Sequence, residues 1–476
     1  MARKRILIIG AGEAGQLLLN DIKKNPSLNY WVVGFIDDFK REGERVNRIE
    51  VLGRIENVPS IAKEKAVNEI IIAIPSLSKE RLSQILSVCN TTGLEIKIMP
   101  ATYEVVYSLK TGRPWYKDVR EIDIEDLLRR RPILPDLKEM EKYVLGKTIL
   151  VTGGGGSIGS EICMQIAEFN PKLLIIIEHS EFNLYNISEK LKERYKDKLE
   201  LKPIIADIRN EKRIKNIFKD NKIDIVFHAA AYKHVHIMED NIKEAITNNV
   251  FGTYNVASAA IENNVKEFVM ISTDKAVNPK GIMGASKRIA EMLINSVQCD
   301  TKFVIVRFGN VIGSSGSVIP LFEKQIKKGG PITITHPEMT RYFMTIPEAA
   351  QLVIQAGAIG KPKDIMVLDM GDQYKVVDVA KELVKIHGLE PEKDIKFEYI
   401  GIRPGEKMHE ELWTSEEEIG KTKNERIFLV KQKEFDKEKF KIGFDELRKI
   451  LEEKEDKEIV NKIKEIIPNY VPFNSE

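Results

Sequence analysis

The chain has 476 residues, of which 43% are hydrophobic and 31% charged, a balance typical of a folded protein with two or three domains. Lysine and arginine number 74 against 72 acidic residues, and the net charge of +2 excludes the strong basic field of a nucleic-acid-binding protein. The three cysteines lie far apart, and no apolar stretch reaches membrane-spanning length. We therefore expect a cytoplasmic protein with no disulfide framework, no metal site and no transmembrane helix.

The first hundred residues alternate between apolar runs and helical patterns. Residues 5–10 predict a strand that ends in the glycine-rich segment 10–15, and a second predicted strand ends at Asp37. This order of strand, glycine loop, helix and acid is typical of nucleotide-binding α/β domains. We expect residues 1–105 to form a Rossmann-like domain. Its site either binds a nucleotide or nucleotide sugar, or is silent or regulatory, because no catalytic motif follows the loop. Residues 106–146 are expected to be a connector.

From Lys147 the alternation of strands and helices starts again and is stronger. Successive apolar runs end in polar residues, among them Glu178, Asp207 and the segment 272–275. A parallel sheet with right-handed crossovers follows, and its ligands should gather where those strands end. The predicted fold class is therefore α/β, with two doubly wound Rossmann-like domains. The second domain spans residues 147–476 and ends in charged, amphipathic helices.

The stretch at residues 149–159 predicts a dinucleotide loop. Gly153, Gly156 and Gly159 are spaced so that the backbone turns sharply and a pyrophosphate approaches the amides at a helix N-terminus. Glu178 follows at the distance where a carboxylate accepts both ribose hydroxyls of NAD and repels the 2′-phosphate of NADP. Asp207 is placed to meet the adenine. The predicted NAD-binding residues are Gly153, Gly156, Ser157, Ile158, Gly159, Glu178, His179, Ser180, Asp207, Ile208, Ala229, Ala230, Ala231, Asn249 and Lys287.

Several further stretches together resemble the extended short-chain dehydrogenases, and within them the polysaccharide-biosynthesis nucleotide-sugar 4,6-dehydratases. The resemblance implies a small C-terminal substrate-binding lobe, built from parts of residues 310–345 and 395–430. The matching stretches are T-G-G-G-G-S-I-G-S-E (152–161), E-H-S-E-F-N-L-Y (178–185), H-A-A-A-Y-K-H-V (228–235), N-N-V-F-G-T (248–253), S-T-D-K-A-V-N-P (272–279), R-F-G-N-V-I-G-S-S-G-S-V-I-P (307–320), M-T-R-Y-F (339–343) and R-P-G-E-K (403–407).

The amino-terminal domain and connector resemble the cytosolic part of the long members of this family. These members dehydrate UDP-N-acetylglucosamine (UDP-GlcNAc) with retention at C5 and usually begin with membrane helices. The resemblance therefore implies a UDP-GlcNAc 4,6-dehydratase for surface polysaccharide or glycan biosynthesis. We expect either a soluble form or the cytosolic part of a membrane-anchored type, and, by analogy with short-chain dehydrogenases, a homo-oligomer. An inverting dehydratase, a nucleotide-sugar epimerase and an inactive NAD and UDP-sugar sensor stay open as alternatives.

One position departs from the common short-chain dehydrogenase pattern. The usual Tyr-x-x-x-Lys pair is here Met283 and Lys287, which the spacing places on one face of a helix. A thioether has no titratable proton, so Met283 cannot act as a base. The resemblance implies that long retaining dehydratases share this methionine, and that Lys287 binds the nicotinamide ribose.

The expected reaction removes a hydride from C4, a proton from C5 and water from C6, so it needs an acid and a base. Asp274, if protonated, would donate to the leaving hydroxyl, and Lys275, if neutral, would take the C5 proton. Burial favours both states, although the attraction between the two charges opposes them. Both side chains reach the sugar only if the backbone turns after Ile271. Thr273 or Asp274 would then relay the C4 hydroxyl proton.

The resemblance also implies residues for the nucleotide sugar. Arginines suit the diphosphate because a guanidinium binds two oxygens at once, although Arg341 and Arg403 would also suit structural ion pairs. The expected substrate-binding residues are Lys233, Asn310, Ser317, Val318, Arg341, Arg403 and Glu406.

Overall fold

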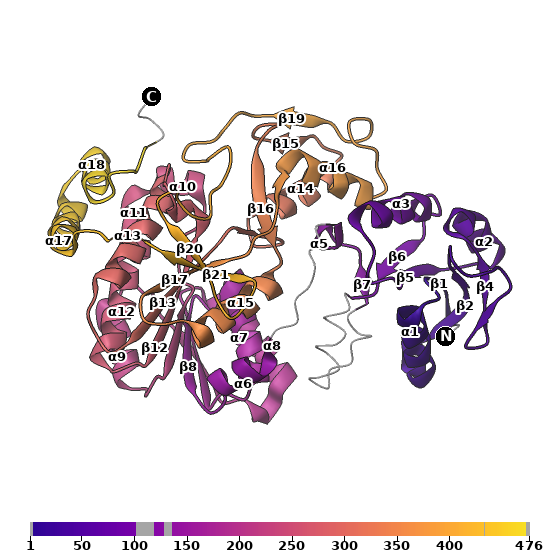
Figure 1. Cartoon of the computed structure of the whole chain (residues 1–476), viewed down its shortest axis with the longest axis horizontal. Helices are drawn as coiled ribbons and strands as arrows, with labels where there is room; N and C mark the ends of the chain where they lie inside the picture. The colour runs from indigo at the N-terminus through magenta and orange to yellow at the C-terminus, as the bar shows by residue number, and fades with distance from the viewer. Residues whose placement is uncertain (1–2, 101–118, 128–135, 433, 473–476) are drawn as a thin grey trace. The chain divides into compact units, whose positions relative to one another are not determined.

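The computed structural model describes residues 3–100, 119–127, 136–432 and 434–472. It confirms the predicted α/β class, with parallel sheets flanked by helices (Figure 1). The chain divides into two compact units. The first holds residues 1–134, 325–332 and 378–397, and the second holds the remainder. Much of the predicted connector lies outside the described residues, so the boundaries at 105 and 146 stay predictions.

The first unit is built on a seven-stranded sheet with the order β3-β4-β2-β1-β5-β6-β7. Its central strands pair in parallel, and β3 and β7 are antiparallel to their neighbours. Because Ile9 pairs with Ile36, the glycine loop after β1 and the acid after β2 lie at the same edge. The elements are β1 Lys4–Ile9, α1 Glu13–Lys24, β2 Tyr30–Ile36, β3 Arg45–Val46, β4 Ile49–Gly53, α2 Val58–Glu64, β5 Glu69–Ile72, α3 Lys79–Asn90, β6 Glu95–Ile98, β7 Arg120–Glu121 and α5 Ile124–Leu127.

The second unit is built on a nine-stranded sheet with the order β10-β9-β8-β11-β12-β13-β17-β21-β20. The strands from β10 to β17 are parallel, and β21 and β20 complete the sheet in antiparallel pairs. Every residue of β8 is buried, as expected of an apolar strand covered on both faces. The strands are β8 Thr148–Thr152, β9 Leu173–Glu178, β10 Leu201–Ile205, β11 Ile225–His228, β12 Glu267–Thr273, β13 Lys302–Phe308, β17 Asp364–Leu368, β20 Glu418–Lys421 and β21 Ile427–Lys431.

Helices cover both faces of this sheet, with α9, α12 and α13 on one side and α6, α7 and α15 on the other (Figure 1). The core between them is almost entirely aliphatic. A π-helical segment, Thr247–Gly252, joins α11 to α12. The helices are α6 Leu137–Val144, α7 Ser157–Glu168, α8 Glu181–Tyr195, α9 Glu211–Lys219, α10 Val235–Glu239, α11 Ile242–Ile246, α12 Thr253–Glu262, α13 Ile282–Ser296, α15 Ile346–Ile359, α17 Lys437–Glu453 and α18 Asp456–Ile466.

The rest of the second unit consists of a small sheet and terminal helices. A three-stranded sheet has the order β14-β16-β18, and α17 and α18 pack their apolar faces into a second cluster with α11 and α13. None of the described helices combines the length and the apolar composition that a bilayer crossing requires. The remaining elements are β14 Asn310–Val311, α14 Val318–Lys327, β15 Ile332–Ile334, β16 Thr340–Met344, β18 Gln373–Lys375, α16 Val376–Ile386 and β19 Phe397–Tyr399.

A buried ion network joins β13, α13 and the segment before β20. The guanidinium of Arg307 donates to both oxygens of Glu291, at 2.8 and 2.7 Å, and to Glu417 at 3.1 Å. Ser272 on β12 also donates to Glu291, at 2.7 Å. Burial alone raises the pKa of Glu291, but Arg307 and Arg288 outweigh it and lower this pKa to about 2. The network therefore holds the end of β12 against α13.

We predict that Arg307→Met lowers the free energy of unfolding of the second unit by about 3 kcal/mol, because the buried Glu291 loses the partner that donates to both of its oxygens and keeps only Arg288 and Ser272. Hydrogen–deuterium exchange of peptides from β12 and β13 in urea measures this change. Lys192→Met, which breaks an exposed pair with Glu189, is the control and should cost less than about 1 kcal/mol. The folded pKa of Glu291 is lowered, so the effect of Arg307→Met should be full above pH 4.5 and shrink as the pH falls toward 2. Equal costs for the two variants would contradict the prediction.

Candidate functional site

A cavity of about 800 Å³ opens where β8, β11, β12 and β13 end, at the edge of the sheet where the sequence predicted ligands. It is large enough for a nucleotide ligand. Residues of the glycine loop, the β12 end, α13 and the C-terminal lobe line it together. The predicted residues that line it are Gly153, Gly156, Ser157, Ile158, Gly159, Ala229, Ala231, Lys233, Thr273, Lys275, Met283, Lys287, Asn310, Ser317, Val318, Arg341, Arg403 and Glu406.

The glycine loop is built without room for side chains. Gly153 has a φ of +64°, and a Cβ there would lie 2.8 Å from the backbone of Ala230. A Cβ on Gly159 would lie 2.2 Å from the carbonyl oxygen of Gly153, so the first turn of α7 packs directly on the loop. The α7 helix begins at Ser157 and directs its free amides toward the cavity. A phosphate can therefore approach backbone donors with no side chain between them.

The two acids predicted to bind the adenosine part of NAD, Glu178 and Asp207, do not line the cavity. The buried carboxylate of Glu178 accepts from the amides of Gly155, His179 and Ser180, so it ties the glycine loop to the end of β9. Asp207 is held by the guanidinium of Arg209, which outweighs burial and lowers the pKa of Asp207. Carboxylates at these strand ends suit hydroxyl and amine donors of a ligand and disfavour an added phosphate.

Three other predicted cofactor-binding residues do not line the cavity but pack behind the residues that do. Ala230 lies against Gly153, and the buried Ile208 packs against Gly252. Asn249, fully buried in the π-helical segment, accepts from the Tyr232 amide and donates to the Tyr232 carbonyl and the Ser286 hydroxyl. These contacts fix the segment after β11 against α13.

The turn at the end of β12 lies further along the chain than the position after Ile271 that the sequence analysis considered. The strand continues through Thr273, and a 3₁₀ turn at Asp274–Ala276 follows, so the backbone turns two residues later than the sequence predicted. The Thr273 hydroxyl donates to Asp274 Oδ1 at 2.8 Å. Asp274 is fully buried and Lys275 is half-buried, so neither faces bulk solvent. The turn brings Thr273, Asp274 and Lys275 into one contacting group.

Lys275 is surrounded by acceptors. Its Nζ donates to Asp274 Oδ1 and Asn310 Oδ1, both at 3.0 Å, and lies 3.4 Å from Glu410 Oε1. Burial by itself lowers the pKa of Lys275, but the Asp274 and Glu410 carboxylates outweigh it and raise this pKa above 10.5. The role expected from the sequence requires a neutral amine, which burial favours and the attraction to Asp274 opposes. In the structure attraction wins, and Lys275 is held as an ammonium.

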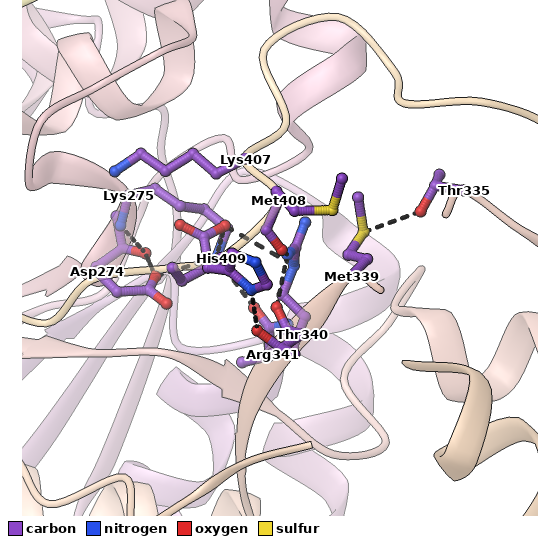
Figure 2. A network of polar contacts seen from close by, with 12 residues as sticks. Asp274, Lys275, Thr335, Met339, Thr340, Arg341, Lys407, Met408 and His409 are labelled. Carbon is purple, nitrogen blue, oxygen red and sulfur yellow. Dashed lines mark hydrogen bonds and ion pairs between the residues drawn. The ribbon is translucent and has the colours of Figure 1, made fainter. Parts of the chain in front are cut away.

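A second group of side chains reaches this turn from the C-terminal lobe. Figure 2 shows Asp274 and Lys275 on one side, with Thr340, Arg341 and His409 converging from the other. Arg341 Nη1 donates to the carbonyl oxygens of Thr340 at 2.7 Å and Met408 at 3.2 Å, and Thr340 Oγ1 contacts His409 Nδ1 at 2.8 Å. These bonds fix the segment around residue 408 against β16.

The helix α13 supplies Met283 and Lys287 to the cavity wall from one face, as their spacing predicted. Lys287 Nζ donates to the carbonyl oxygen of Ile271 at 2.7 Å. Burial lowers the pKa of Lys287 to about 8, with the Glu291 carboxylate opposing it. Lys287 therefore lies between the strand end and the cavity, where it can donate to a hydroxyl.

The lobe side of the cavity carries polar atoms with no partner among the described residues. They include Ser317 Oγ and Glu406 Oε2, both buried. Lys233 and Arg403 line the same region, and burial lowers the pKa of Lys233. The Ser315 amide donates to Ser157 Oγ at 3.2 Å, so this lobe touches the start of α7. Unpaired buried oxygens beside cations are the pattern of a site for a polar, anionic ligand.

Two functional features could not be identified from the sequence. Glu410 is adjacent to Glu411, and only packing makes the first buried and leaves the second 51% exposed. The fully buried His228 bridges the hydroxyls of Thr152 and Thr253, at 2.8 and 2.9 Å. Burial lowers its pKa to about 3, so it stays neutral and serves the packing below the glycine loop.

The first unit repeats the device of a glycine loop tied to an acid. Asp37 accepts from the Ala11 amide at 2.8 Å and from the Phe39 and Lys40 amides at 2.9 and 3.1 Å. Glu178 makes the equivalent bonds in the second unit. Across the residues that the structure describes, no group of three or more His, Cys, Asp or Glu side chains is arranged to hold a metal ion.

Comparison with known proteins assigns the second unit. Residues 149–432 match the polysaccharide biosynthesis protein family, and residues 2–100 match the CoA-binding domain family. The chain belongs to the polysaccharide biosynthesis protein family. It is thereby a member of the nucleotide-sugar dehydratases and epimerases of the extended short-chain dehydrogenase superfamily, as the motifs predicted.

Three similar proteins illustrate this family. Capsular polysaccharide biosynthesis protein CapD of Staphylococcus aureus is 46% identical over 434 residues, which is 90% of this chain and 72% of CapD. Probable polysaccharide biosynthesis protein EpsC of Bacillus subtilis is 46% identical over 419 residues, which is 87% of this chain and 69% of EpsC. The X-ray structure of Pen from Bacillus thuringiensis is 37% identical, with a TM-score of 0.55, and the match covers 60% of this chain and 90% of Pen.

We predict that Gly159→Ala weakens NAD binding at least about tenfold, because the added methyl group forces α7 away from the loop. Calorimetric titration with NAD measures the loss, and the melting temperature separates it from a loss of fold. Gly420→Ala is the matched control, since its nearest neighbours would lie 3.7 Å from the new Cβ. Unchanged affinity in Gly159→Ala would contradict a dinucleotide site at this loop.

Proposed function

We propose that this protein is an NAD-dependent 4,6-dehydratase of UDP-GlcNAc that forms UDP-2-acetamido-2,6-dideoxy-4-keto-hexose with retention at C5. The observation that carries the proposal is the turn after β12, from which Thr273 and Lys275 line the same cavity as the glycine loop and Lys287, with the buried Asp274 bonded to both of them. A carboxylate and an amine at the nicotinamide end suit a reaction that must move protons as well as a hydride.

The glycine loop and its surroundings fit NAD. The loop leaves no space for side chains, the α7 amides would face the pyrophosphate, and the Glu178 and Asp207 carboxylates end the strands beside which the adenosine would lie. Lys287 would hold the nicotinamide ribose. Bound there, NAD+ would make the reaction redox-neutral by accepting a hydride from C4 of the sugar and returning it to C6.

The acid–base groups come from the end of β12. Thr273, whose hydroxyl donates to Asp274, relays the C4 hydroxyl proton to the Asp274 carboxylate, and Asp274 then donates this proton to the hydroxyl that leaves C6. Lys275 has acceptors around its ammonium, so it stabilises the negative charge that develops on the C4 oxygen when C5 loses its proton. Met283 occupies the tyrosine position without titrating.

The lobe would hold the UDP part of the substrate. Lys233, Arg341 and Arg403 neutralise the diphosphate, and Asn310, with Glu406, Ser317 and Val318, orients the sugar and nucleoside. The unpaired oxygens of Ser317 and Glu406 are acceptors for ribose or uracil donors. Arg341 is already held by backbone carbonyls, which presents its remaining donors in a fixed direction.

The related candidates differ from this proposal in their products. An inverting dehydratase would give the other configuration at C5, an epimerase would release no water, and a sensor would bind both ligands without turnover. Met283 and the long architecture, with an amino-terminal domain before the catalytic one, support retention, because the resemblance links both to the retaining dehydratases. For the first unit we propose nucleotide binding at the loop that Asp37 holds, and for the whole protein a homo-oligomer.

We predict that the wild-type protein, incubated with UDP-GlcNAc in D₂O, yields a 4-keto-6-deoxy sugar with deuterium at C5. NMR of the sugar protons identifies the product, its configuration at C5 and the exchange of the C5 proton with solvent in one experiment. Asp274→Asn should lower kcat about 10²- to 10⁴-fold, because it removes the proton donor, and leave UDP-GlcNAc binding nearly unchanged. Asp300→Asn, at an exposed position, is the control. A wild-type product that keeps its C6 hydroxyl would refute the dehydratase.

A further inference from the structure

Glu410 is a buried acid at the reacting end of the cavity that the sequence analysis did not identify. Its side chain is 2% exposed, it lines the cavity, and its Oε2 has no hydrogen-bond partner among the described residues. The opposite oxygen, Oε1, lies 3.4 Å from Lys275 Nζ and 3.8 Å from Arg341 Nε. One oxygen is therefore held by cations, and the other is free for a ligand.

The position of Glu410 is fixed by its neighbours on both sides. Gln373 on β18 donates to the Glu410 carbonyl at 2.8 Å, and the Thr340 amide donates to the Met408 carbonyl at 3.1 Å. Lys407 Nζ donates to the Val277 carbonyl, at 2.6 Å, just beyond the 3₁₀ turn. The carboxylate is therefore delivered to the end of β12 by a rigid segment.

Lys275 is poorly arranged to remove a proton from carbon. An ammonium has three N–H donors, and its three close neighbours are Asp274 Oδ1, Asn310 Oδ1 and Glu410 Oε1, all acceptors. To act as a base it would first have to lose a proton to one of them. A carboxylate with an unpaired oxygen has no such requirement, and Glu410 provides one.

Resting on the proposed dehydratase function, we propose that Glu410 is the base that removes the C5 proton of the sugar, with Lys275 as the ammonium beside it. The C5–H bond breaks, the proton goes to Glu410 Oε2, and the electron pair forms the C4–C5 double bond of an enolate. The C6–O bond then breaks, and Asp274 gives the proton it received from the C4 hydroxyl to the departing hydroxide, which leaves as water. A hydride returned to C6 by reduced nicotinamide would re-form the C4–C5 enolate, and Glu410, after exchanging its proton with solvent, would return a proton to C5. Both carboxylates then end the turnover in the state in which they began it.

The charges around Glu410 suit this role. Lys275 and Asp274 face it from the turn after β12, Arg341 faces it from β16, and His409 adjoins it on its own segment. Two cations lie beside Oε1, and Oε2 is left without a protein partner, in position to accept a proton from a ligand in the cavity. The Lys275 ammonium lines the cavity beside Glu410, so its positive charge is close to the developing enolate oxygen as the proton transfers.

The test compares Glu410→Gln with Glu411→Gln, the same change one residue further on at an exposed position that pairs with Lys407 and Asn278. Glu410→Gln should lower turnover and deuterium exchange at C5 about 10²- to 10⁴-fold. It should still oxidise C4, so the absorbance of reduced nicotinamide and the 4-keto sugar should accumulate in a single turnover. UDP-GlcNAc binding by calorimetry and the melting temperature should resemble those of Glu411→Gln, which stays fully active.

The pH dependence of turnover provides a second readout. A Glu410 base beside a charged Lys275 predicts activity that falls as the carboxylate is protonated at acid pH, and falls again when Lys275 loses its proton at alkaline pH. A Lys275 base predicts activity that keeps rising into the alkaline range. Glu410→Asp, which keeps the carboxylate, should recover part of the exchange and the same profile, even if Glu410→Gln is unstable.

The outcomes separate this proposal from the proposed function. Exchange at C5 in Glu410→Gln at the wild-type rate, or activity that only rises with pH, would overturn Glu410 as the base and leave the dehydratase intact. A wild-type protein that binds UDP-GlcNAc and NAD but forms no 4-keto-6-deoxy sugar would overturn both. Loss of exchange together with retained C4 oxidation would support both.

Discussion

The structure depends on one electrostatic arrangement, a single ammonium held between two carboxylates in a buried site. Lys275 contacts Asp274, its neighbour in the chain, and Glu410, which is 135 positions further along. Isolated buried charges are costly, so each of these groups is tolerated only while the others are present. The contact therefore requires the end of β12 and the C-terminal lobe to meet in one geometry. That geometry also encloses the cavity and brings the glycine loop, Lys287 and the lobe cations to one ligand.

Behind this site lies a second buried network that makes no contact with a ligand. Arg307 and Glu291 join β13 to α13, and Ser272, near the end of β12, donates to the same carboxylate. Since α13 also carries Met283 and Lys287, the network sets the position of the helix relative to the Asp274 turn. An exposed ion pair would not hold these elements as firmly, because water competes for both partners. The buried charges that hold the elements together are thus separate from the charges that line the cavity.

The sequence predicted the fold class and the family correctly because both depend on local patterns. Strand–loop–helix periodicity and glycine spacing are visible in single segments, and the structure places Gly153 and Gly159 as that spacing requires. The position of the turn after β12 was predicted two residues early, since Ser272 and Thr273 suit a strand or a turn equally well. The protonation state of Lys275 could not be predicted, because it depends on a distant carboxylate. Nothing in the sequence distinguishes Glu410 from Glu411, and only tertiary packing does so.

The lobe segment around Glu410 has a consequence for how such an enzyme can change over evolution. Arg403, Glu406 and Glu410 line the cavity, yet they belong to a loop that leads into β20 and β21 at the far side of the sheet from β8. Substitutions at positions 403 and 406 would change the groups offered to a ligand without disturbing the glycine loop, whereas position 410 is constrained by its contact with Lys275. A family built this way could acquire new ligand preferences in one short loop while the dinucleotide-binding half stays the same.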